Sequence, residues 1–105
     1  MPKISVVMPV YNEKIYMLQE AIDSVIRQTF IDWELIIVCD NMYDNNIKGY
    51  LDSIKDERVK ILFNEMHLGE VCSRNKGIHS AEGQYIAVLD ADDVCEPDRF
   101  EIELH

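Results

Sequence analysis

Asp90, Asp92 and Asp93 place three carboxylates within four residues, directly after the apolar run at residues 85–89. An apolar run of this length, bounded by Gly83 and by polar residues, predicts a buried β-strand. Carboxylates this close repel one another unless a cation or hydrogen bonds compensate their charge. A hard divalent cation such as Mg²⁺ or Mn²⁺ prefers oxygen ligands and often accompanies phosphates. The alternative is a polar turn whose Asp side chains cap the next helix.

Three other side chains have chemistry that suits a ligand contact, each with a structural alternative. Tyr11 follows an apolar run and can stack on a nucleobase, or pack on its own helix. Asp40 ends the second apolar run and can accept a hydrogen bond from a base or ribose, or cap a turn. Arg74 suits a phosphate or base contact, or pairs with a nearby acid. His67 is predicted to be an ordinary loop residue, because nothing nearby completes a metal site.

The elements that must position these side chains alternate between strand and helix. Apolar runs rich in β-branched residues predict strands at Ile4–Val10, 34–39, Val59–Phe63 and 85–89. Helical spacing of apolar residues predicts helices at 18–27, 47–54 and 70–81, and a fourth from Pro97 to His105. Continuous apolar strands are typical of a parallel sheet covered on both faces. We therefore predict an α/β fold, a Rossmann-like open parallel sheet of order 3-2-1-4.

In that order the direction of winding reverses between the first and fourth strands. Tyr11 and Asp90 leave those two strands at their carboxyl ends, so they are expected on opposite sides of one crevice. Gly77, inside the third predicted helix, costs about 1 kcal/mol relative to Ala. Close packing of that helix on the sheet is the expected reason for it.

Composition limits the classes of function. A chain of 105 residues predicts a single domain, 1–105. The net charge of −10 leaves no basic stripe for nucleic acid. Three cysteines without metal-ligand spacing favour reduced thiols in a cytoplasmic protein, and no apolar run is long enough to span a membrane. The last predicted helix has no strand after it, which suggests truncation of a longer parent protein at the carboxyl end.

Several segments, taken in order, resemble the amino-terminal half of the family-2, GT-A-type inverting glycosyltransferases. They are SVVMPVYNE at 5–13, SVIRQTF at 24–30 with WELII at 33–37, SRNKGI at 73–78, and GQYIAVLDADD at 83–93. No single segment is specific, but the ordered set is, and it covers nearly the whole chain. The resemblance implies a domain that binds a nucleotide-diphospho-sugar, with a UDP-sugar favoured, for glycosyl transfer to an unidentified acceptor glycan or lipid.

The resemblance also implies roles for residues at the nucleotide. Pro9, Val10 and Tyr11 would line the base pocket, and Glu13 would lie near the ribose or base. Asp40 would hydrogen-bond the base, and Arg74 would reach the base or the diphosphate.

The acidic cluster matches the Asp-x-Asp motif of the same family. Asp92 would bind the divalent metal, Mn²⁺ or Mg²⁺, that bridges the diphosphate, and Asp90 would contribute to the metal and lie nearer the ribose and donor sugar. Ala91, between them, would belong to the nucleotide site. The metal would act as a Lewis acid that stabilises the departing nucleoside diphosphate.

The sequence departs from the family pattern in two places. The family usually shows Val-Asp-Asp-Gly-Ser after the second strand, where this chain has Val38-Cys39-Asp40-Asn41-Met42. An ungapped alignment puts Cys39 at the first acid, and a one-residue shift matches Asp40-Asn41 to the pair. The family's catalytic base, usually an acid farther along the chain, has no candidate here. The chain is therefore expected to bind a donor without turning it over.

Two other classes of function remain open at this point. A phosphoacceptor receiver domain has similar length, α/β alternation and an acidic pocket, but it carries its acid pair after the first strand, where this chain has Pro9-Val10-Tyr11. It also needs a Lys after a fifth strand. A non-catalytic α/β interaction module with a decayed site would agree with Cys39 and with the missing half.

Overall fold

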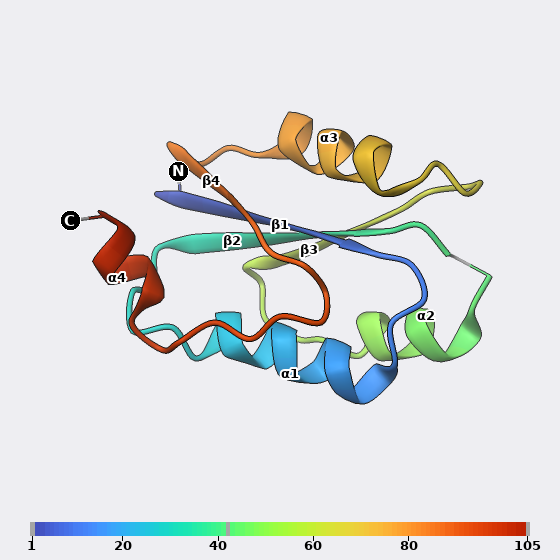
Figure 1. The fold of residues 1–105 in the computed structure, drawn as a ribbon, viewed down its shortest axis with the longest axis horizontal. Helices are drawn as coiled ribbons and strands as arrows, with labels where there is room; N and C mark the ends of the chain where they lie inside the picture. Colours follow the sequence, from blue (N-terminus) through green and yellow to red (C-terminus); the bar gives the residue numbers. More distant parts are fainter. Residues whose placement is uncertain (1, 42, 105) are drawn as a thin grey trace.

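Strands and helices alternate along the chain in the computed structural model, which describes residues 2–41 and 43–104 (Figure 1). Met42 and His105, which belong to the second-strand motif and the last predicted helix, lie outside the described residues. The elements are β1 (Ile4–Val10), α1 (Ile15–Ile26), β2 (Trp33–Cys39), α2 (Asn45–Asp52), β3 (Val59–Phe63), α3 (Glu70–Ser80), β4 (Tyr85–Val88) and α4 (Arg99–Leu104).

The four strands form one parallel sheet in the order β3-β2-β1-β4, which confirms the predicted order. Ile4 of the central strand β1 is opposite Trp33 of β2 on one side and Tyr85 of β4 on the other. Leu35 of β2 is opposite Val59 of β3. Because all pairings are parallel, the four carboxyl ends lie at one edge of the sheet.

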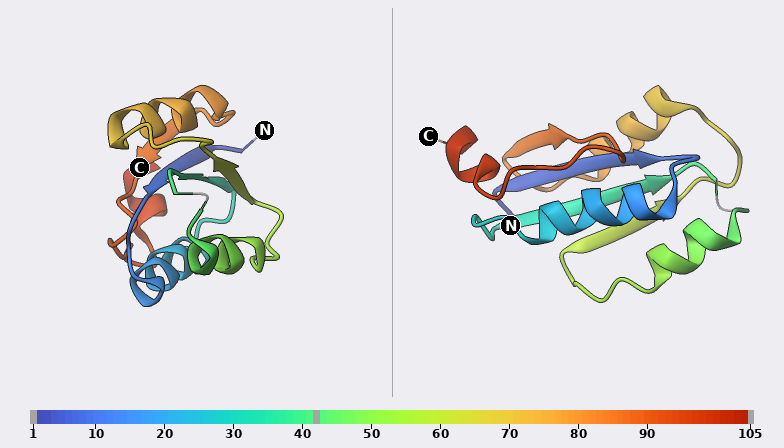
Figure 2. Two further views of the ribbon diagram at one scale, coloured as in Figure 1. Left: turned by 90° about the vertical axis from the view of Figure 1, so that its right-hand side faces the viewer. Right: turned by 60° about the horizontal axis from the view of Figure 1, so that its bottom comes forward.

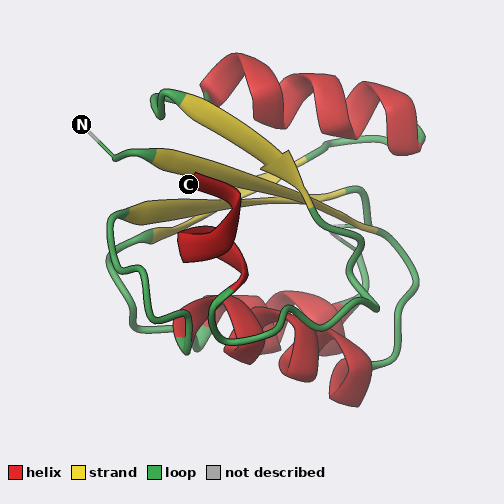
Figure 3. Ribbon diagram, turned by 60° about the vertical axis from the view of Figure 1, so that its left-hand side comes forward, coloured by secondary structure: helices red, strands yellow, loops and turns green. Residues whose placement is uncertain are grey.

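Helices cover both faces of the sheet, as predicted. α1 and α2 lie on one face and α3 on the other (Figures 1 and 2). The chain after β4 returns across the α1 face to reach α4 (Figure 3). Four hydrogen bonds fix that return. Three involve side chains: Cys95 N to Ser24 Oγ at 3.0 Å, Gln28 Nε2 to the Glu96 carbonyl at 2.6 Å, and Phe100 N to Gln28 Oε1 at 3.1 Å. The fourth joins Thr29 N to the Pro97 carbonyl at 2.8 Å.

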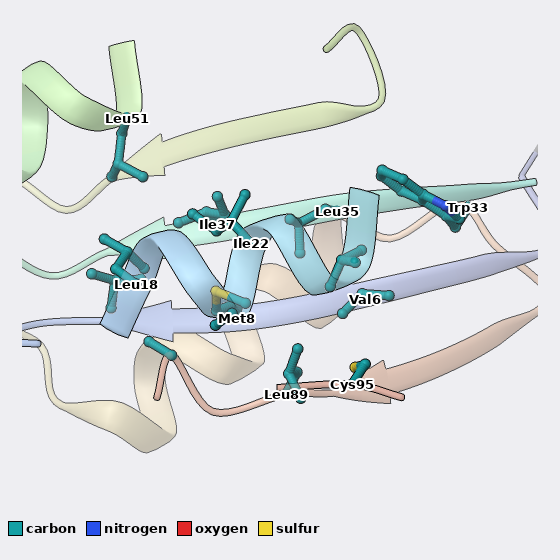
Figure 4. Packing of buried hydrophobic residues seen from close by; sticks show 14 of the residues in the cluster. Val6, Met8, Leu18, Ile22, Trp33, Leu35, Ile37, Leu51, Leu89 and Cys95 are labelled. Atoms are coloured by element: carbon teal, nitrogen blue, oxygen red, sulfur yellow. The ribbon is translucent and has the colours of Figure 1, made fainter. Parts of the chain in front are cut away.

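The main hydrophobic core lies between the sheet and α1. Met8 of β1 and Ile37 of β2 face Leu18 and Ile22 of α1, and all four side chains are fully buried (Figure 4). Burying an apolar side chain of this size stabilises the fold by about 1.5–3 kcal/mol relative to leaving it exposed. This core holds β1 and β2 rigidly, and both strands end at the edge that carries the candidate site.

The opposite face of the sheet carries α3 at close range. A Cβ at Gly77 would lie 2.5 Å from Val7 Cγ1 and 3.2 Å from Val38 Cγ2, so only Gly allows the helix to come this near. The predicted reason for Gly77 is confirmed. This close approach brings the first turns of α3, with the buried Ser73, over the carboxyl ends of the strands.

Two predictions about the last third of the chain need correction. The prediction of a buried strand at 85–89 is wrong for Tyr85, Ile86 and Val88, which are exposed because β4 is an edge strand and α3 packs mainly on β1 and β2. The last helix begins at Arg99, not at Pro97, because residues 97 and 98 form a turn. Among the described helices, none has the length and apolar character needed to cross a membrane.

Candidate functional site

A cavity of about 370 Å³ opens at the carboxyl edge of the sheet. Its walls come from the end of β1, from the segments that follow the four strands and from the start of α3. The cavity therefore spans the crevice predicted at the reversal of strand order. The lining residues are Pro9, Val10, Tyr11, Glu13, Asp40, His67, Glu70, Ser73, Asp90, Ala91 and Asp92.

The cavity brings together most of the side chains that the sequence singled out. Asp93 and Arg74 do not line it. Arg74 lies half-buried on α3, and its contact with a base or diphosphate stays a prediction. His67, Glu70 and Ser73 also line the cavity, although nothing in the sequence pattern predicted a role for them there. The position of His67 in the loop after β3, at the same edge of the sheet as the other candidates, could have identified it as a cavity residue.

The backbone of Tyr11 is held through both its N–H and its carbonyl group. Its backbone N–H donates to Glu13 Oε1 at 2.8 Å, and its carbonyl accepts from Asn41 Nδ2 at 3.2 Å. The tyrosine ring lies beside the imidazole of His67, with ring centroids 4.4 Å apart and planes tilted by 41°. Tilted pairs at this distance are favourable aromatic contacts. Two rings from different loops therefore form one corner of the cavity.

Asp40 is buried and accepts four hydrogen bonds or ion-pair contacts from the loop after β3. Oδ1 accepts from Asn64 Nδ2 and from Leu68 N, both at 2.8 Å. Oδ2 accepts from Gly69 N at 2.9 Å and lies 2.7 Å from His67 Nδ1. Burial by itself raises the pKa of Asp40, but the bonds from Leu68 N, Asn64 and Gly69 N outweigh it and hold that pKa below its ordinary value.

The loop that Asp40 holds is also tied to α3. Asn64 donates to Ser73 Oγ at 2.9 Å and accepts from Lys76 Nζ at 2.8 Å. Gly69 immediately before α3 has φ of 91°, a conformation that favours glycine. Asp40 therefore fixes the position of the whole segment from Asn64 to the start of α3.

The structure also separates Cys39 from Asp40. The Cys39 side chain lies in the hydrophobic core, where burial raises the pKa of its thiol, whereas Asp40 faces the loop after β3. Successive residues of a strand point to opposite faces, so only one of the two can face the site. Asp40 is the acid that lines the cavity, whichever alignment is used for the family motif.

The acidic cluster after β4 has the opposite character. Asp90, Asp92 and Asp93 are exposed, and each offers a carboxylate oxygen within 4.8 Å of the others. Among residues 2–41 and 43–104, no protein hydrogen bond or ion pair holds these three carboxylates. The turn expected from the alternative interpretation is present, with Asp93 N donating to the Asp90 carbonyl at 3.0 Å, but α4 begins only at Arg99 and these side chains do not cap it.

The chain matches the family model described as glycosyl transferase family 2 over residues 5–104. An uncharacterised glycosyltransferase of Methanocaldococcus jannaschii is 45% identical over 104 residues, which are 95% of this chain and 35% of that protein. The Escherichia coli UDP-Glc:alpha-D-GlcNAc-diphosphoundecaprenol beta-1,3-glucosyltransferase is 35% identical over 96% of this chain and 39% of its own length. The chain therefore spans well under half the length of these relatives.

Solved structures agree on the fold. Residues 1–349 of Staphylococcus aureus TarS, in complex with UDP-GlcNAc, superpose with a TM-score of 0.85 at 24% identity, over 97% of this chain and 30% of that one. The sheet order and the helices match the Rossmann-like amino-terminal part of the GT-A fold. Because the family model matches residues 5–104, nearly the whole chain, this chain belongs to glycosyltransferase family 2.

Proposed function

We propose that this chain is the donor-binding domain of a glycosyltransferase and binds a nucleotide-diphospho-sugar together with a divalent cation, Mn²⁺ or Mg²⁺. Family membership supports the class of enzyme, and the E. coli relative is named for a UDP-glucose donor. The TarS complex with UDP-GlcNAc places a UDP-sugar in a protein of the same fold. A UDP-sugar is therefore the donor we favour for this chain.

The charge of the cavity is the observation that carries the proposal. Five carboxylates line it, and His67 is its only basic side chain among the described residues. A diphosphate is itself an anion, so it cannot be stable beside this wall without added positive charge. Asp90 and Asp92, which line the wall, and the neighbouring Asp93 are exposed, and their carboxylate oxygens lie within 4.8 Å of one another. None of the three carboxylates has a protein partner among the described residues. Oxygen ligands in this arrangement fit Mg²⁺ or Mn²⁺.

The residues around the cavity divide the proposed donor into two ends. Pro9, Val10 and Tyr11 form the base end, with Glu13 toward the ribose. Asp40 is proposed to hydrogen-bond the base, and it also holds the loop after β3 that bounds the base end. This arrangement gives the base an apolar and aromatic wall and leaves the acidic wall for the diphosphate.

The diphosphate end is formed by the segment after β4. Asp90 and Ala91 would contact the ribose and donor sugar, and Asp92 with Asp90 would hold the cation. When bound, the cation supplies Lewis-acid stabilisation of the departing nucleoside diphosphate. Arg74, one turn along α3 from Glu70, is proposed to reach the base or the diphosphate. No residue of the chain is assigned the role of catalytic base, and we propose that the isolated chain binds a donor without turning it over.

The proposal also covers the acceptor, nucleic acid and the location of the protein. The acceptor is proposed to be a glycan or a lipid, and a net charge of −10 argues against nucleic acid. Three free cysteines, two of them buried, support a reducing location such as the cytoplasm.

Calorimetric titration of the 105-residue chain tests the proposal. UDP and GDP are titrated in Mn²⁺, in Mg²⁺ and in excess EDTA, after circular dichroism has shown that the sample is folded. We expect UDP to bind in the presence of metal and to bind at least tenfold more weakly in EDTA. A folded sample that binds neither nucleotide under any of these conditions would contradict the proposal and would favour the non-catalytic interaction module.

The receiver alternative has no support in the structure. β1 ends in Pro9 and Val10 with no acid pair, and the family match assigns residues 5–104 to another class. Acetyl phosphate provides the direct check: a stable aspartyl-phosphate adduct on this chain would reopen that alternative, and we expect none.

A further inference from the structure

One buried carboxylate interrupts the otherwise apolar strand β2, at the end of the sheet opposite the cavity. Glu34 is 3% exposed, although every other residue of β2 is apolar. Its Oε2 accepts from Ser5 Oγ at 2.5 Å and from Glu82 N at 2.8 Å, and its Oε1 accepts from Lys60 Nζ at 2.8 Å. Buried charges are often no more stabilising than apolar side chains of similar size, so stability alone does not account for Glu34.

The contacts of Glu34 converge on the connection between α3 and β4. Beside the bond from Glu82 N to Glu34, Gly83 N donates to Ser5 Oγ at 2.8 Å. A Cβ at Gly83 would lie 2.6 Å from Ser5 Oγ and 2.7 Å from Ser5 N, so the connection lies directly against β1. Ser5 and Glu34 are opposite each other in β1 and β2. The two central strands therefore hold two adjacent N–H groups just before β4 begins.

The strand β4 has few other contacts that define its register. It is four residues long, and among the described residues only β1 pairs with it. Tyr85, Ile86 and Val88 are exposed, so packing of these side chains does not decide which residue lies opposite which. Asp90 and Asp92 follow soon after β4. A shift of β4 by two residues keeps each side chain on its face of the sheet and moves the acids by about 6.6 Å.

We propose that Glu34 is a positioning residue for the acidic cluster: together with Ser5 it sets the register of β4 on β1 and so places Asp90 and Asp92 in the wall of the cavity. This inference deepens the proposed cation site and rests on it for its functional consequence. Buried polar networks whose members are all hydrogen-bonded can specify one arrangement of a fold without adding to its stability. Glu34 thus acts from the amino end of the sheet on carboxylates beyond its carboxyl end.

A competing account assigns the position of the acids to the far end of β4 alone. Leu89 and Ala91 are buried in the core, and Leu89 N donates to the Val7 carbonyl at 3.0 Å. If these contacts suffice, removal of the Glu34 carboxylate lowers stability and leaves the acids in place. If Glu34 sets the register, the same change moves the acids and weakens the effect of the cation.

Two measurements separate these accounts. The first is the gain in UDP affinity that Mn²⁺ produces, obtained by calorimetry in Mn²⁺ and in EDTA. The second is the register of β4, obtained without ligand from cross-strand nuclear Overhauser contacts between β1 and β4, such as those between Ile4 and Tyr85. Thermal melting shows which variants are folded at the temperature of the measurements.

The variants differ in which bonds of the carboxylate they remove. Glu34→Leu removes every acceptor, whereas Glu34→Gln keeps an oxygen that can accept from Glu82 N. Lys60→Met is the matched control, because it removes the ion pair of the same carboxylate and keeps the bonds to the α3–β4 connection. Ser5→Ala removes the acceptor of Gly83 N and keeps the Glu34 carboxylate.

We expect Glu34→Leu to reduce the Mn²⁺-dependent gain in UDP affinity from about tenfold to less than about twofold, the scale on which residues that orient metal ligands act. Its UDP affinity in EDTA should stay unchanged, and its contacts between β1 and β4 should change. Glu34→Gln should keep most of the gain. Lys60→Met should keep the full gain even though its melting temperature falls.

A folded Glu34→Leu protein that keeps either the wild-type register or the full Mn²⁺-dependent gain overturns the inference. Equal loss of the gain in Lys60→Met also overturns it, because that result shows a general effect of lower stability. If Glu34→Leu does not fold, Ser5→Ala takes its place, with the same outcomes. A wild-type chain that binds no UDP would instead overturn the proposed function, and the register measurement alone would then decide the role of Glu34.

Discussion

Asp40 and Asp92 lie at the same edge of the sheet and line the same cavity, yet their surroundings differ completely. Asp40 is 5% exposed, and both of its oxygens are surrounded by donors from the segment between Asn64 and Gly69. Asp92 is exposed, has no protein partner among the described residues, and lies with two other carboxylates. One acid holds the structure together, and the other is left available for a ligand.

The comparison separates two uses of negative charge in one small domain. A buried carboxylate is tolerated because hydrogen bonds replace the water that it loses. An exposed acidic cluster has no such compensation and raises the energy of the site through repulsion until a cation binds. A carboxylate without protein partners is therefore a better guide to a cation than a carboxylate in a cavity as such.

The largest difference is expected in stability. Asp40→Ala leaves Leu68 N, Gly69 N and Asn64 without their acceptor and should lower the free energy of unfolding by about 3 kcal/mol. Asp92→Ala should change it by less than about 0.5 kcal/mol, because its carboxylate has no protein partner to lose. Urea unfolding of the two variants and the wild-type chain measures both values. Equal losses in the two variants would remove the distinction between the two acids.

The same distinction predicts a dependence of stability on pH. The pKa of Asp40 in the folded chain lies below its ordinary value. Its contribution to the free energy of unfolding is therefore fully present above the pKa that an Asp has in the unfolded chain, about 3.9. That contribution is lost as the pH falls through the lower folded value. Glu34 acts in the same direction: burial raises its pKa, but hydrogen bonds from Lys60, Ser5 and Glu82 N outweigh it.

Asp40→Asn tests this sign, measured as the free energy of unfolding between about pH 3 and 7. The difference in stability between wild type and Asp40→Asn should be constant above about pH 5 and should shrink below about pH 4. A gap between wild type and Asp40→Asn that stays constant at low pH would show that the Asp40 charge does not stabilise the fold.

A smaller effect is expected at the loop that Asp40 holds. Gly69 has a φ of 91°, and a Cβ there would meet no atom within 4 Å, so Gly69→Ala adds backbone strain without a clash. We expect a loss of about 1 kcal/mol in the free energy of unfolding. Gly49→Ala is the control, because Gly49 lies in α2 with open space around its Cα and without positive φ. There Ala should stabilise the helix by several tenths of a kcal/mol. Equal effects at the two sites would mean that the loop conformation is not constrained.

Much of the fold was predictable because it depends on local pattern. The continuous apolar runs of β1 and β2 and the helical spacing of Leu18 and Ile22 determine which faces are buried, and the alternation of elements predicts a parallel sheet. The exposure of β4 was not predictable in this way, because an apolar run does not tell whether a neighbouring element covers it.

The same distinction between local pattern and tertiary contacts applies to the candidate site. The acidic cluster and Tyr11 could be placed from their positions after strands, since parallel strands bring their carboxyl ends together. The four contacts of Asp40 and the neighbouring ring of His67 could not, because they depend on the path of a loop whose conformation is set by tertiary contacts. No repeating pattern of residues in the sequence encodes the path of such a loop.

The most direct test of the account is the gain in UDP affinity that Mn²⁺ produces in the wild-type chain and in Asp92→Ala, with exposed Asp52→Ala as the control. Calorimetry in Mn²⁺ and in EDTA gives that gain for each protein. We predict a gain of at least tenfold, about 1.4 kcal/mol, in the wild type and the control, and no gain in Asp92→Ala. An Asp92→Ala protein that is folded and keeps the full metal-dependent gain would contradict the assignment of the exposed acids to the cation.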